Sequence, residues 1–183
     1  EPIVDIIVLV HDKPDWAELC VRAVEHFTKN PHRVIVVDMA SQQPETVDLF
    51  EQWKARGHTV VHLADNKSFS HGVNVGVRTG VSKFCIVLND DAIVTEGWDS
   101  ALLSDLSVSQ VGMVGARSNF AAGAQGGQKC HGDPPWLVFV CVAMRREVWN
   151  VVGPLDEENF TGFSCEDLDY SWRVQKAGYK LKV

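Results

Sequence analysis

Apolar runs alternate with segments of helical spacing along the first two thirds of the chain. The run at residues 3–10 is rich in β-branched side chains and is typical of a strand buried on both faces of a parallel sheet. A helix with one apolar stripe is predicted to follow, with Pro14 at its start. Repetition of this order predicts right-handed βαβ units and a doubly wound α/β sheet. The apolar stripe of the first helix comprises Trp16, Cys20, Ala23, Val24 and Phe27. The further predicted elements are strands at 33–39, 58–63 and 84–88 and helices at about 45–53 and 72–79.

The last third of the chain has a different rhythm. Residues 117–135 are rich in Gly and Ala and carry no apolar period, and a loop of this length inside a compact domain is usually functional or mobile. The elements predicted around it are strands at 111–116, 136–144 and from 179 onward, and helices at 145–153 and 165–178. Because no linker composition interrupts the pattern, we predict a single domain over residues 1–183.

Charge narrows the classes of partner. The formal net charge is −7 and no basic cluster stands out, which argues against a nucleic-acid surface. An acidic chain that binds a polyanion would need a metal ion or a local basic group. The five cysteines lack the spacing of a metal site, so we expect reduced thiols, with Cys20 and Cys85 buried as small apolar residues and Cys130 and Cys165 less defined.

The chain contains no targeting signal that we can identify. No apolar run approaches the length of a membrane span, and no signal peptide stands at its start. We therefore expect a cytoplasmic protein without a membrane span. Segments or partners outside this chain, which begins at Glu1, could still direct it to a membrane.

Polar side chains follow three of the predicted strands at the point where each strand ends. His11 and Asp12 follow the first strand, Asp38 lies near the end of the second, and residues 89–91 follow the fourth. In open α/β sheets ligands bind beyond the carboxyl ends of the strands, so these side chains should converge on one crevice. An Asp in such a place is also a common turn former or helix cap, and for Asp12 the two interpretations are about equally supported.

The sequence VLNDDAIV places two adjacent carboxylates at the end of a buried strand. In an extended backbone Asn89 and Asp91 lie on one side and Asp90 on the other. Amide and carboxylate oxygens are hard ligands suited to Mg²⁺ or Mn²⁺. Taken alone, this short cluster is better explained as a turn.

Two further segments carry candidate chemistry. Residues 65–80, DNKSFSHGVNVGVRTG, lead into a helix whose free N–H groups would face the same crevice, although Gly72 and Gly76 could simply allow close packing. Later, Glu166, Asp167 and Asp169 stand at the start of a helix. They could serve the helix dipole, with Asp169 pairing to a residue four positions on, but three acids in four residues exceed what capping requires.

Six segments in this order resemble the family 2 glycosyltransferases, nucleotide-sugar-dependent enzymes of the GT-A fold. VDIIVLVHDKPDW resembles their first strand and turn, VIVVDMAS their second strand, and NKSFSHGVNVGV their Asn- and Gly-containing stretch. IVLNDDAIV is similar to their DXD segment, MRREVWNVVGPLDEENF to their RRE and DE motifs, and GFSCEDLDYSWRVQKAGYKL to their ED helix. The resemblance covers nearly the whole chain.

The resemblance implies a role for particular residues. His11 stands where the family often has an aromatic ring that stacks on the nucleobase. Asp38 stands where a family carboxylate accepts a hydrogen bond from the base, typically from uracil N3–H. Asn89 and Asp91 occupy the DXD positions, so Asp91 should be linked to a metal that neutralises the diphosphate. Asp167 matches the general base, with Glu166 beside it for acceptor binding. To the donor surface we also assign Asp12, Asn66, Asn74 and Asp90.

The chain departs from the family pattern at several points. Ser68 and Phe139 stand where Gly is usual, and both should narrow the donor or acceptor pocket. Family members often carry a His downstream of the ED helix that completes the metal site, and this chain ends at Val183, before that position. We expect either that water takes the place of this ligand or that the sequence is a shortened one. Of the seven histidines, only His131 in the long loop is a candidate to replace it. The alternative interpretation of His131 is an ordinary loop residue.

We therefore expect a GT-A, Rossmann-like α/β domain with a mostly parallel sheet and an antiparallel element in its last third. Residues 1–91 would bind nucleotide and residues 92–183 the acceptor. The expected reaction is an inverting transfer of a sugar from a nucleotide donor, UDP first, to a glycan, lipid-linked or other hydroxyl acceptor, with Mn²⁺ or Mg²⁺. The loop 117–135 is a candidate lid, and Trp136 and Phe163 are candidate sugar platforms or core residues.

Two other functions remain open from the sequence. A metal-dependent nucleotidyltransferase would use the same crevice, although no basic, Gly-rich phosphate loop follows the first strand. A non-catalytic module that binds only nucleotide or glycan would account for the missing downstream His.

Overall fold

A computed structural model describes residues 1–129, 132–161 and 165–183. Its elements are β1 (Val4–Val10), α1 (Pro14–Phe27), β2 (His32–Asp38), α2 (Pro44–Ala55), β3 (Thr59–His62), α3 (Phe69–Thr79), β4 (Phe84–Asn89), α4 (Trp98–Leu106), β5 (Val111–Gly115), the 3₁₀ turn η1 (Gly123–Gly126), β6 (Cys141–Arg145), α5 (Arg146–Val152), α6 (Glu166–Lys176) and β7 (Lys180–Lys182).

The strands form a seven-stranded sheet in the order β3-β2-β1-β4-β6-β5-β7. β3, β2, β1 and β4 are mutually parallel, and β5 pairs with β7 in parallel. β6 runs antiparallel to both of its neighbours. The predicted α/β fold, mostly parallel with an antiparallel element late in the chain, is therefore confirmed.

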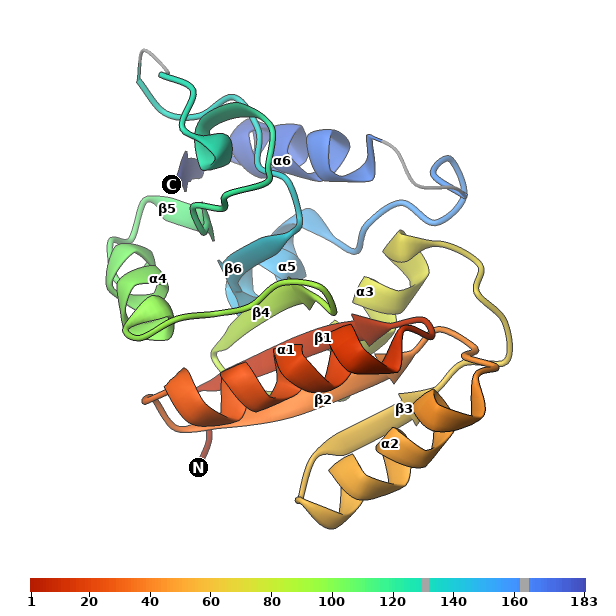
Figure 1. The fold of residues 1–183 in the computed structure, drawn as a ribbon. Coiled ribbons are helices and arrows are strands. Elements are labelled where there is room, and N and C mark those ends of the chain that lie inside the picture. Colours follow the sequence, from red (N-terminus) through yellow and green to blue (C-terminus); the bar gives the residue numbers. More distant parts are fainter. Residues whose placement is uncertain (130–131, 162–164) are drawn as a thin grey trace.

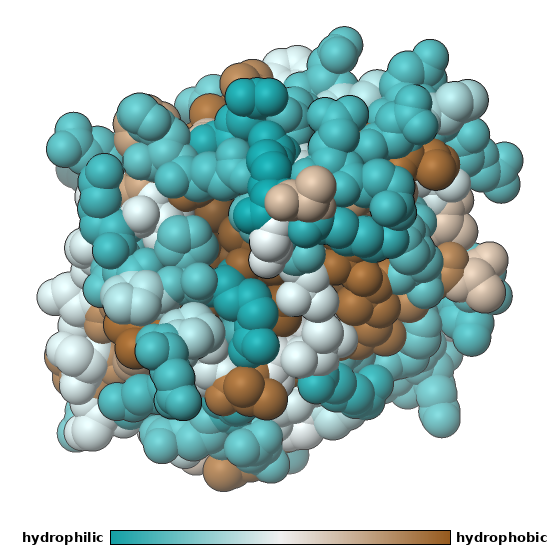
Figure 2. All heavy atoms as spheres, turned by 90° about the horizontal axis from the view of Figure 1, so that it is seen from below, coloured by the Kyte–Doolittle hydropathy of each residue, from teal (hydrophilic) through white to brown (hydrophobic). Residues whose placement is uncertain are grey.

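Helices cover both faces of the sheet, as Figure 1 shows. β1 is buried along its whole length, which explains its uninterrupted apolar sequence. Its side chains alternate between two cores: Ile6 and Val8 pack with α1, α2 and α4, whereas Ile7 and Leu9 pack with α3, α5 and α6. The face seen in Figure 2 is mainly polar at its rim, with apolar residues exposed nearer its middle.

Helix α3 lies close to the sheet because it carries glycines at the contact. A Cβ added at Gly76 would lie 2.3 Å from Ile7 Cγ2, and one at Gly72 would lie 2.4 Å from Leu9 Cδ2. Such distances are far below van der Waals contact, so a larger residue would push the helix away. The packing interpretation of these glycines is therefore supported.

Several predicted elements differ from the structure. Of the apolar run 136–144, only the part from Cys141 onward is strand, and the segment before it is irregular. α3 begins at Phe69 rather than near Gly72, because the Ser68 hydroxyl caps it by accepting from the N–H of His71 at 3.1 Å. Ser68 is thus a helix cap. Helix α4 was not predicted, since its nine residues follow Gly97 without a capping side chain.

The predicted stripe on α1 is wrong at one position. Trp16 is 53% exposed, whereas Ala17, Cys20 and Val21 are buried. Cys20 and Cys85 are buried free thiols, as expected, and Cys165 is an exposed free thiol; Cys130 lies outside the described residues. Within the part of the chain that the structure describes, no helix combines the length and the apolar character needed to cross a membrane.

Candidate functional site

The candidate site lies where the direction of strand addition reverses. β2 lies beside β1, and β3 lies beyond β2 on the same side. The chain then returns through α3, and β4 pairs with β1 on its other side. The carboxyl ends of β1 and β4 are therefore neighbours at a topological switch point, the place where open α/β sheets bind ligands. The backbone N–H of His11 donates to Asp90 Oδ2 at 3.4 Å and joins the two ends.

The acidic segment after β4 forms a turn. The strand ends at Asn89, whose carbonyl accepts from the N–H of Ala92 at 3.1 Å. The expectation that Asn89 and Asp91 share one side of an extended strand is therefore wrong, because the backbone folds back at Asp90. Asp90 is partly buried, and Asp91 is exposed.

The electrostatics of this turn suit a cation. The pKa of Asp90 is raised to about 6, mainly by burial; the bond from His11 opposes this rise and the neighbouring charge of Asp91 adds to it. Among the described residues no group of three or more His, Cys, Asp or Glu could hold a metal ion alone. However, Mg²⁺-type ions are commonly held by one or two carboxylates together with substrate phosphates. The two carboxylates and Asn89 fit a metal shared with a diphosphate.

A hollow of about 470 Å³ opens beside Asp91. Lys13, Pro14, Asp15 and Trp16 form the rest of its lining, so the first turn of α1 provides one wall. The chain enters this helix through two left-handed residues, Asp12 at φ 57° and Lys13 at φ 54°. Non-glycine residues rarely adopt this conformation, and such strain is concentrated at functional sites.

The ring of His11 is exposed at the edge of this site. Its Nδ1 lies 2.9 Å from the carbonyl oxygen of Met39, which follows β2. The imidazole is therefore held between the ends of β1 and β2, at an exposed position. Such a ring is a suitable surface for a nucleobase.

Asp12 binds the chain that leads into α2. Its Oδ1 accepts from the N–H groups of Gln42 and Gln43, both at 2.8 Å, and its own N–H donates to Ser41 Oγ at 3.0 Å. The bond from Gln43 is the main cause of the lowered pKa of Asp12. The turn interpretation therefore describes this side chain well, although it serves α2 rather than the helix that directly follows it.

Asp38 is buried at the end of β2, and both of its oxygens are held. Oδ1 accepts from the N–H of Ser41 at 2.7 Å, and His62 Nδ1 lies 2.9 Å from Oδ2. His62 was not predicted as part of the site. The signal that could have found it is the register of the sheet, in which Asp38 and His62 are direct partners.

The two asparagines assigned to the donor surface have different environments. Asn66 is exposed before α3. Asn74 is fully buried, donates to the Leu155 carbonyl at 2.8 Å and to Glu157 Oε1 at 2.6 Å, and accepts from the N–H of Leu155 at 2.9 Å. Its amide thereby holds Leu155 and Glu157 in place, and its assignment to the donor surface stays a prediction.

Glu157, in the segment that resembles the DE motif, is a second residue to which the sequence assigned no role. It accepts from Asn74, and its Oε2 lies 2.7 Å from His71 Nδ1. Burial raises the pKa of Glu157, but the bonds from Asn74 and His71 outweigh it, so the pKa is lowered overall. This residue fastens α3 to the segment before α6.

The ED motif forms the first turn of α6. Asp167 is partly buried, and burial raises its pKa although its Oδ1 accepts from the N–H of Leu168 at 2.8 Å. Glu166 is also partly buried. Asp169 pairs with Arg173 at 2.8 Å, which confirms the expected pair four residues apart. A carboxylate with a raised pKa is better suited to accept a proton than an ordinary one.

The long loop is partly anchored. The side chain of the buried Gln125 in η1 donates to the carbonyls of Ala116 and Val138 and accepts from the N–H of Val138 at 2.6 Å. Phe139 is also buried, between the rings of Phe69 and Tyr170, and so belongs to the core. His131 and Phe163, the candidate metal ligand and sugar platform, lie outside the described residues.

Comparisons of sequence place the chain beside known proteins. Residues 5–147 match the family model described as glycosyl transferase family 2. The chain is 28% identical over 189 residues to the O-antigen biosynthesis protein RfbC of Myxococcus xanthus, covering 85% of this chain and 15% of that protein. It is 24% identical over 210 residues to the uncharacterized protein y4gI of Sinorhizobium fredii. This match covers 97% of this chain and 23% of that protein. The chain thus spans less than a quarter of the length of these relatives.

Comparisons of structure agree on the fold. The mannosyltransferase PcManGT from Pyrobaculum calidifontis, in complex with GDP-Man and Mn²⁺, superimposes with a TM-score of 0.81 at 17% identity, covering all of this chain and 55% of that one. GalNAc-T7 with UDP, GalNAc and Mn²⁺ also reaches a TM-score of 0.81, at 14% identity. That match covers all of this chain and 42% of that one. TarS of S. aureus reaches 0.75 at 14% identity, with 98% and 57% coverage.

Proposed function

The chain belongs to glycosyl transferase family 2, and we propose that it transfers a sugar from a nucleoside diphosphate donor to a hydroxyl acceptor. The observation that carries the proposal is the meeting of His11 with the acidic turn at Asp90 and Asp91, at the switch point of the sheet. A surface for the nucleobase and an acidic turn whose Asp91 lines a hollow are what such a donor requires.

The nucleoside would bind at the ends of β1 and β2. His11 offers an exposed ring for stacking, and Asp38 offers a carboxylate for an N–H of the base. Uracil N3–H is such a donor, so we propose UDP as the nucleotide. The structural relatives hold GDP-Man in one case and UDP in another, and guanine also presents N–H groups at its edge.

The diphosphate would lie beside the turn after β4. Asp91, with Asn89 and Asp90, would hold a divalent ion, Mn²⁺ or Mg²⁺, and both named relatives with a bound nucleotide or nucleotide sugar contain Mn²⁺. Such an ion, when bound, would neutralise the charge of the departing nucleoside diphosphate. It would also allow a chain of net charge −7 to bind a polyanion.

The first turn of α6 would supply the base. Asp167 would accept the proton of the acceptor hydroxyl as the oxygen attacks the sugar carbon C1, and Glu166 would help to bind the acceptor. A base on the side of C1 opposite the diphosphate gives in-line displacement with inversion. The donor would then be bound mainly by residues 1–91 and the acceptor by residues 92–183.

The acceptor class follows from the relatives in general terms. RfbC is named for O-antigen biosynthesis, so we propose a glycan or lipid-linked hydroxyl and a role in polysaccharide biosynthesis. The chain covers only 15% of that protein, and other segments of a longer protein would then contribute to acceptor choice.

The proposal can be tested with a panel of nucleotide sugars. The protein is incubated with each donor and Mn²⁺, with EDTA in parallel, and free nucleoside diphosphate is measured. Metal-dependent release from one donor, lost in Asp167→Asn with nucleotide binding retained, supports the proposal. Release of pyrophosphate from a nucleoside triphosphate would indicate a nucleotidyltransferase, and nucleotide binding without turnover for any donor and acceptor would indicate a binding module.

A further inference from the structure

Asp38 is fixed by a side chain from the neighbouring strand. In the parallel pairing of β2 with β3, Asp38 is the direct partner of His62, so both side chains lie on the same face of the sheet. His62 Nδ1 lies 2.9 Å from Asp38 Oδ2, and the N–H of Leu63 donates to the Asp38 carbonyl at 2.9 Å. Figure 1 shows β2, β3 and the overlying α2 at one edge of the domain.

The partner of the other ring nitrogen determines the tautomer of His62. Lys54 Nζ, in the last turn of α2, lies 3.1 Å from His62 Nε2. An ammonium group has three donors and no acceptor, so Nε2 must accept and cannot carry a proton. The remaining proton of the neutral ring is therefore on Nδ1, and it is donated to Asp38.

Two further contacts hold this arrangement. The His62 ring packs edge-on against Phe50, with centroids 5.3 Å apart at 83°. Lys54 is itself oriented by Glu51 Oε1 at 2.7 Å. Because the side chain of His62 is 47% exposed, the core does not require the imidazole for burial, and the hydrogen bonds account for its placement.

We propose that Lys54 and His62 form a positioning relay that orients the Asp38 carboxylate to accept an N–H from the nucleobase of the donor. With Ser41 on Oδ1 and His62 on Oδ2, the carboxylate cannot rotate, and its remaining lone pairs keep a fixed direction. The ligand class is a base with an N–H at its edge, such as the imide of uracil. This inference rests on the proposed function, since it specifies how the same donor site selects its base.

Binding of UDP in the presence of Mn²⁺, measured by calorimetry, tests the relay. His62→Phe keeps the ring against Phe50 but removes both nitrogens, and we expect the Kd for UDP to rise about tenfold, the value of one hydrogen bond to a charged group. His62→Asn retains an N–H where Nδ1 lies and should restore most of the affinity. Replacement of an exposed His elsewhere, His26→Phe in the last turn of α1, is the matched control and should leave the Kd unchanged.

The tautomer provides a readout that a purely structural role would not change. Nitrogen NMR of the imidazoles, with the His62 signals assigned by their loss in His62→Phe, should show a protonated Nδ1 and a bare Nε2. In Lys54→Met the apolar stem remains but the donor is lost, so a fraction of the ring should shift to the Nε2–H form, with a rise of about threefold in the Kd for UDP.

Each outcome has a distinct meaning. Wild-type affinity in folded His62→Phe, or an Nε2–H ring in the unmodified protein, would overturn the relay. If no nucleoside diphosphate binds the unmodified protein, the proposed function itself fails. If Asp38→Ala loses UDP binding while His62→Phe and Lys54→Met keep it, the donor site stands and only the relay is wrong.

Discussion

The backbone N–H of His11 donates to Asp90 Oδ2 over 3.4 Å, and this bond links the end of β1 to the end of β4. It engages one oxygen of the Asp90 carboxylate, whereas Asp91 is exposed and lines the hollow. The two adjacent acids thereby have different environments: Asp90 accepts from the backbone at the end of β1, and Asp91 is open to solvent.

Asp91→Asn should therefore lose metal-dependent binding of the donor. We expect the affinity for UDP with Mn²⁺ to fall by at least about tenfold. Loss of a residue that only supports a metal ligand already costs about 10–100-fold in metal affinity, and a direct ligand should cost no less. Removal of the metal from the unmodified protein with EDTA should have a similar effect. The measurement is the Kd for UDP by calorimetry, with and without Mn²⁺.

Asp15→Asn is the matched control for this experiment, because Asp15 lines the same hollow but lies in the first turn of α1. Its affinity for UDP with Mn²⁺ should stay near that of the unmodified protein. Equal losses in both variants would mean that the hollow responds to charge in general, and the assignment of Asp91 to the metal would be wrong.

Asp167→Asn should remove turnover while leaving the donor site intact. Loss of a general base typically costs about 10²–10⁴-fold in rate, and the amide has nearly the same shape as the carboxyl group. The kcat for release of nucleoside diphosphate is measured together with the Kd for UDP. Asp169→Asn, in the same turn but paired with Arg173, should keep most of the activity.

The pH dependence of the rate should also show whether Asp167 acts as the general base. Burial raises the pKa of Asp167, and a base must be ionised to accept a proton. The rate should therefore fall as the pH drops through this raised pKa, at a higher pH than an ordinary carboxyl group would give. A plot of log kcat against pH checks this, and a limb at the pH of an ordinary Asp would contradict the assignment.

The two asparagines of the segment before and within α3 should respond to substitution in opposite ways. Asn74→Ala removes the buried partner of Glu157 Oε1 and of the Leu155 backbone, although Glu157 keeps its contact with His71, so the free energy of unfolding should fall by about 2–4 kcal/mol. Its folded form should bind UDP normally. Asn66→Ala, at an exposed position, should change stability by less than about 0.5 kcal/mol but weaken the binding of UDP.

Urea unfolding and calorimetry on the two variants provide the measurements. If Asn74→Ala unfolds like the unmodified protein and binds UDP poorly, Asn74 contacts the donor and its structural role is smaller than the hydrogen bonds suggest. If Asn66→Ala binds UDP normally, Asn66 does not belong to the donor surface.

The sequence predicted those features that depend on local pattern. The apolar run of β1 reports burial on both faces, and the polar residues at strand ends follow from the rule that parallel strands end at one edge. The strand predicted at 136–144 was too long, because apolar residues in an irregular segment can be buried as well as those in a strand; Leu137 and Phe139 are examples.

Contacts between distant residues were not predictable from such patterns. Glu157 meets Asn74 across 83 positions, and His62 meets Asp38 only once two strands are in register. The different environments of Asp90 and Asp91 depend on the turn from Asn89 to Ala92, which hydrophobic periodicity does not resolve. The sequence predicted which polar segments follow the strand ends, whereas the partners of each side chain required the fold.

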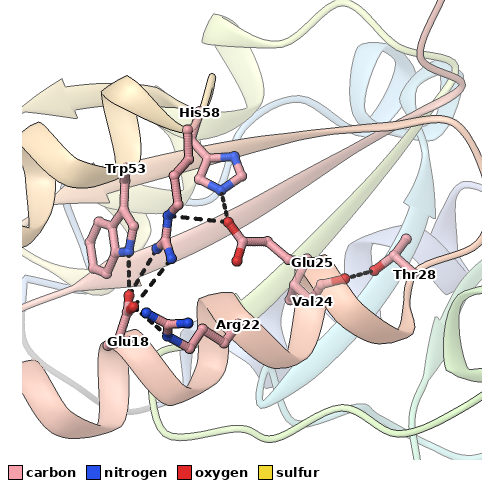
Figure 3. Close-up of polar contacts among 8 residues, drawn as sticks. Glu18, Arg22, Val24, Glu25, Thr28, Trp53 and His58 are labelled. Carbon is pink, nitrogen blue, oxygen red and sulfur yellow. Dashed lines mark hydrogen bonds and ion pairs between the residues drawn. The ribbon is translucent and has the colours of Figure 1, made fainter.

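Glu18 joins α1 to α2 in a cluster that should make stability depend on pH. Figure 3 shows its carboxylate beside Arg22 and the indole of Trp53. Glu18 accepts from Trp53 Nε1 at 2.7 Å, from Arg22 Nε at 2.6 Å and from Arg56 Nη2 at 2.9 Å. Burial raises the pKa of Glu18, but the bonds from Arg56 and Trp53 outweigh it, so the pKa is lowered overall.

A carboxyl group whose pKa is lower in the folded state stabilises the protein above its ordinary pKa, and this contribution is lost as the pH falls through the folded-state value. We expect Glu18→Gln to reduce the free energy of unfolding by about 1 kcal/mol near pH 7. The loss is this small because the ion pair of Glu18 with Arg56 is only partly shielded from solvent. Near pH 3 the variant and the unmodified protein should differ by less. Glu96→Gln, at an exposed loop position, is the control and should show no such dependence on pH. Urea unfolding at the two pH values measures the difference, and a loss in Glu18→Gln that is the same at both would mean that packing around Trp53, rather than charge, is what Glu18 contributes.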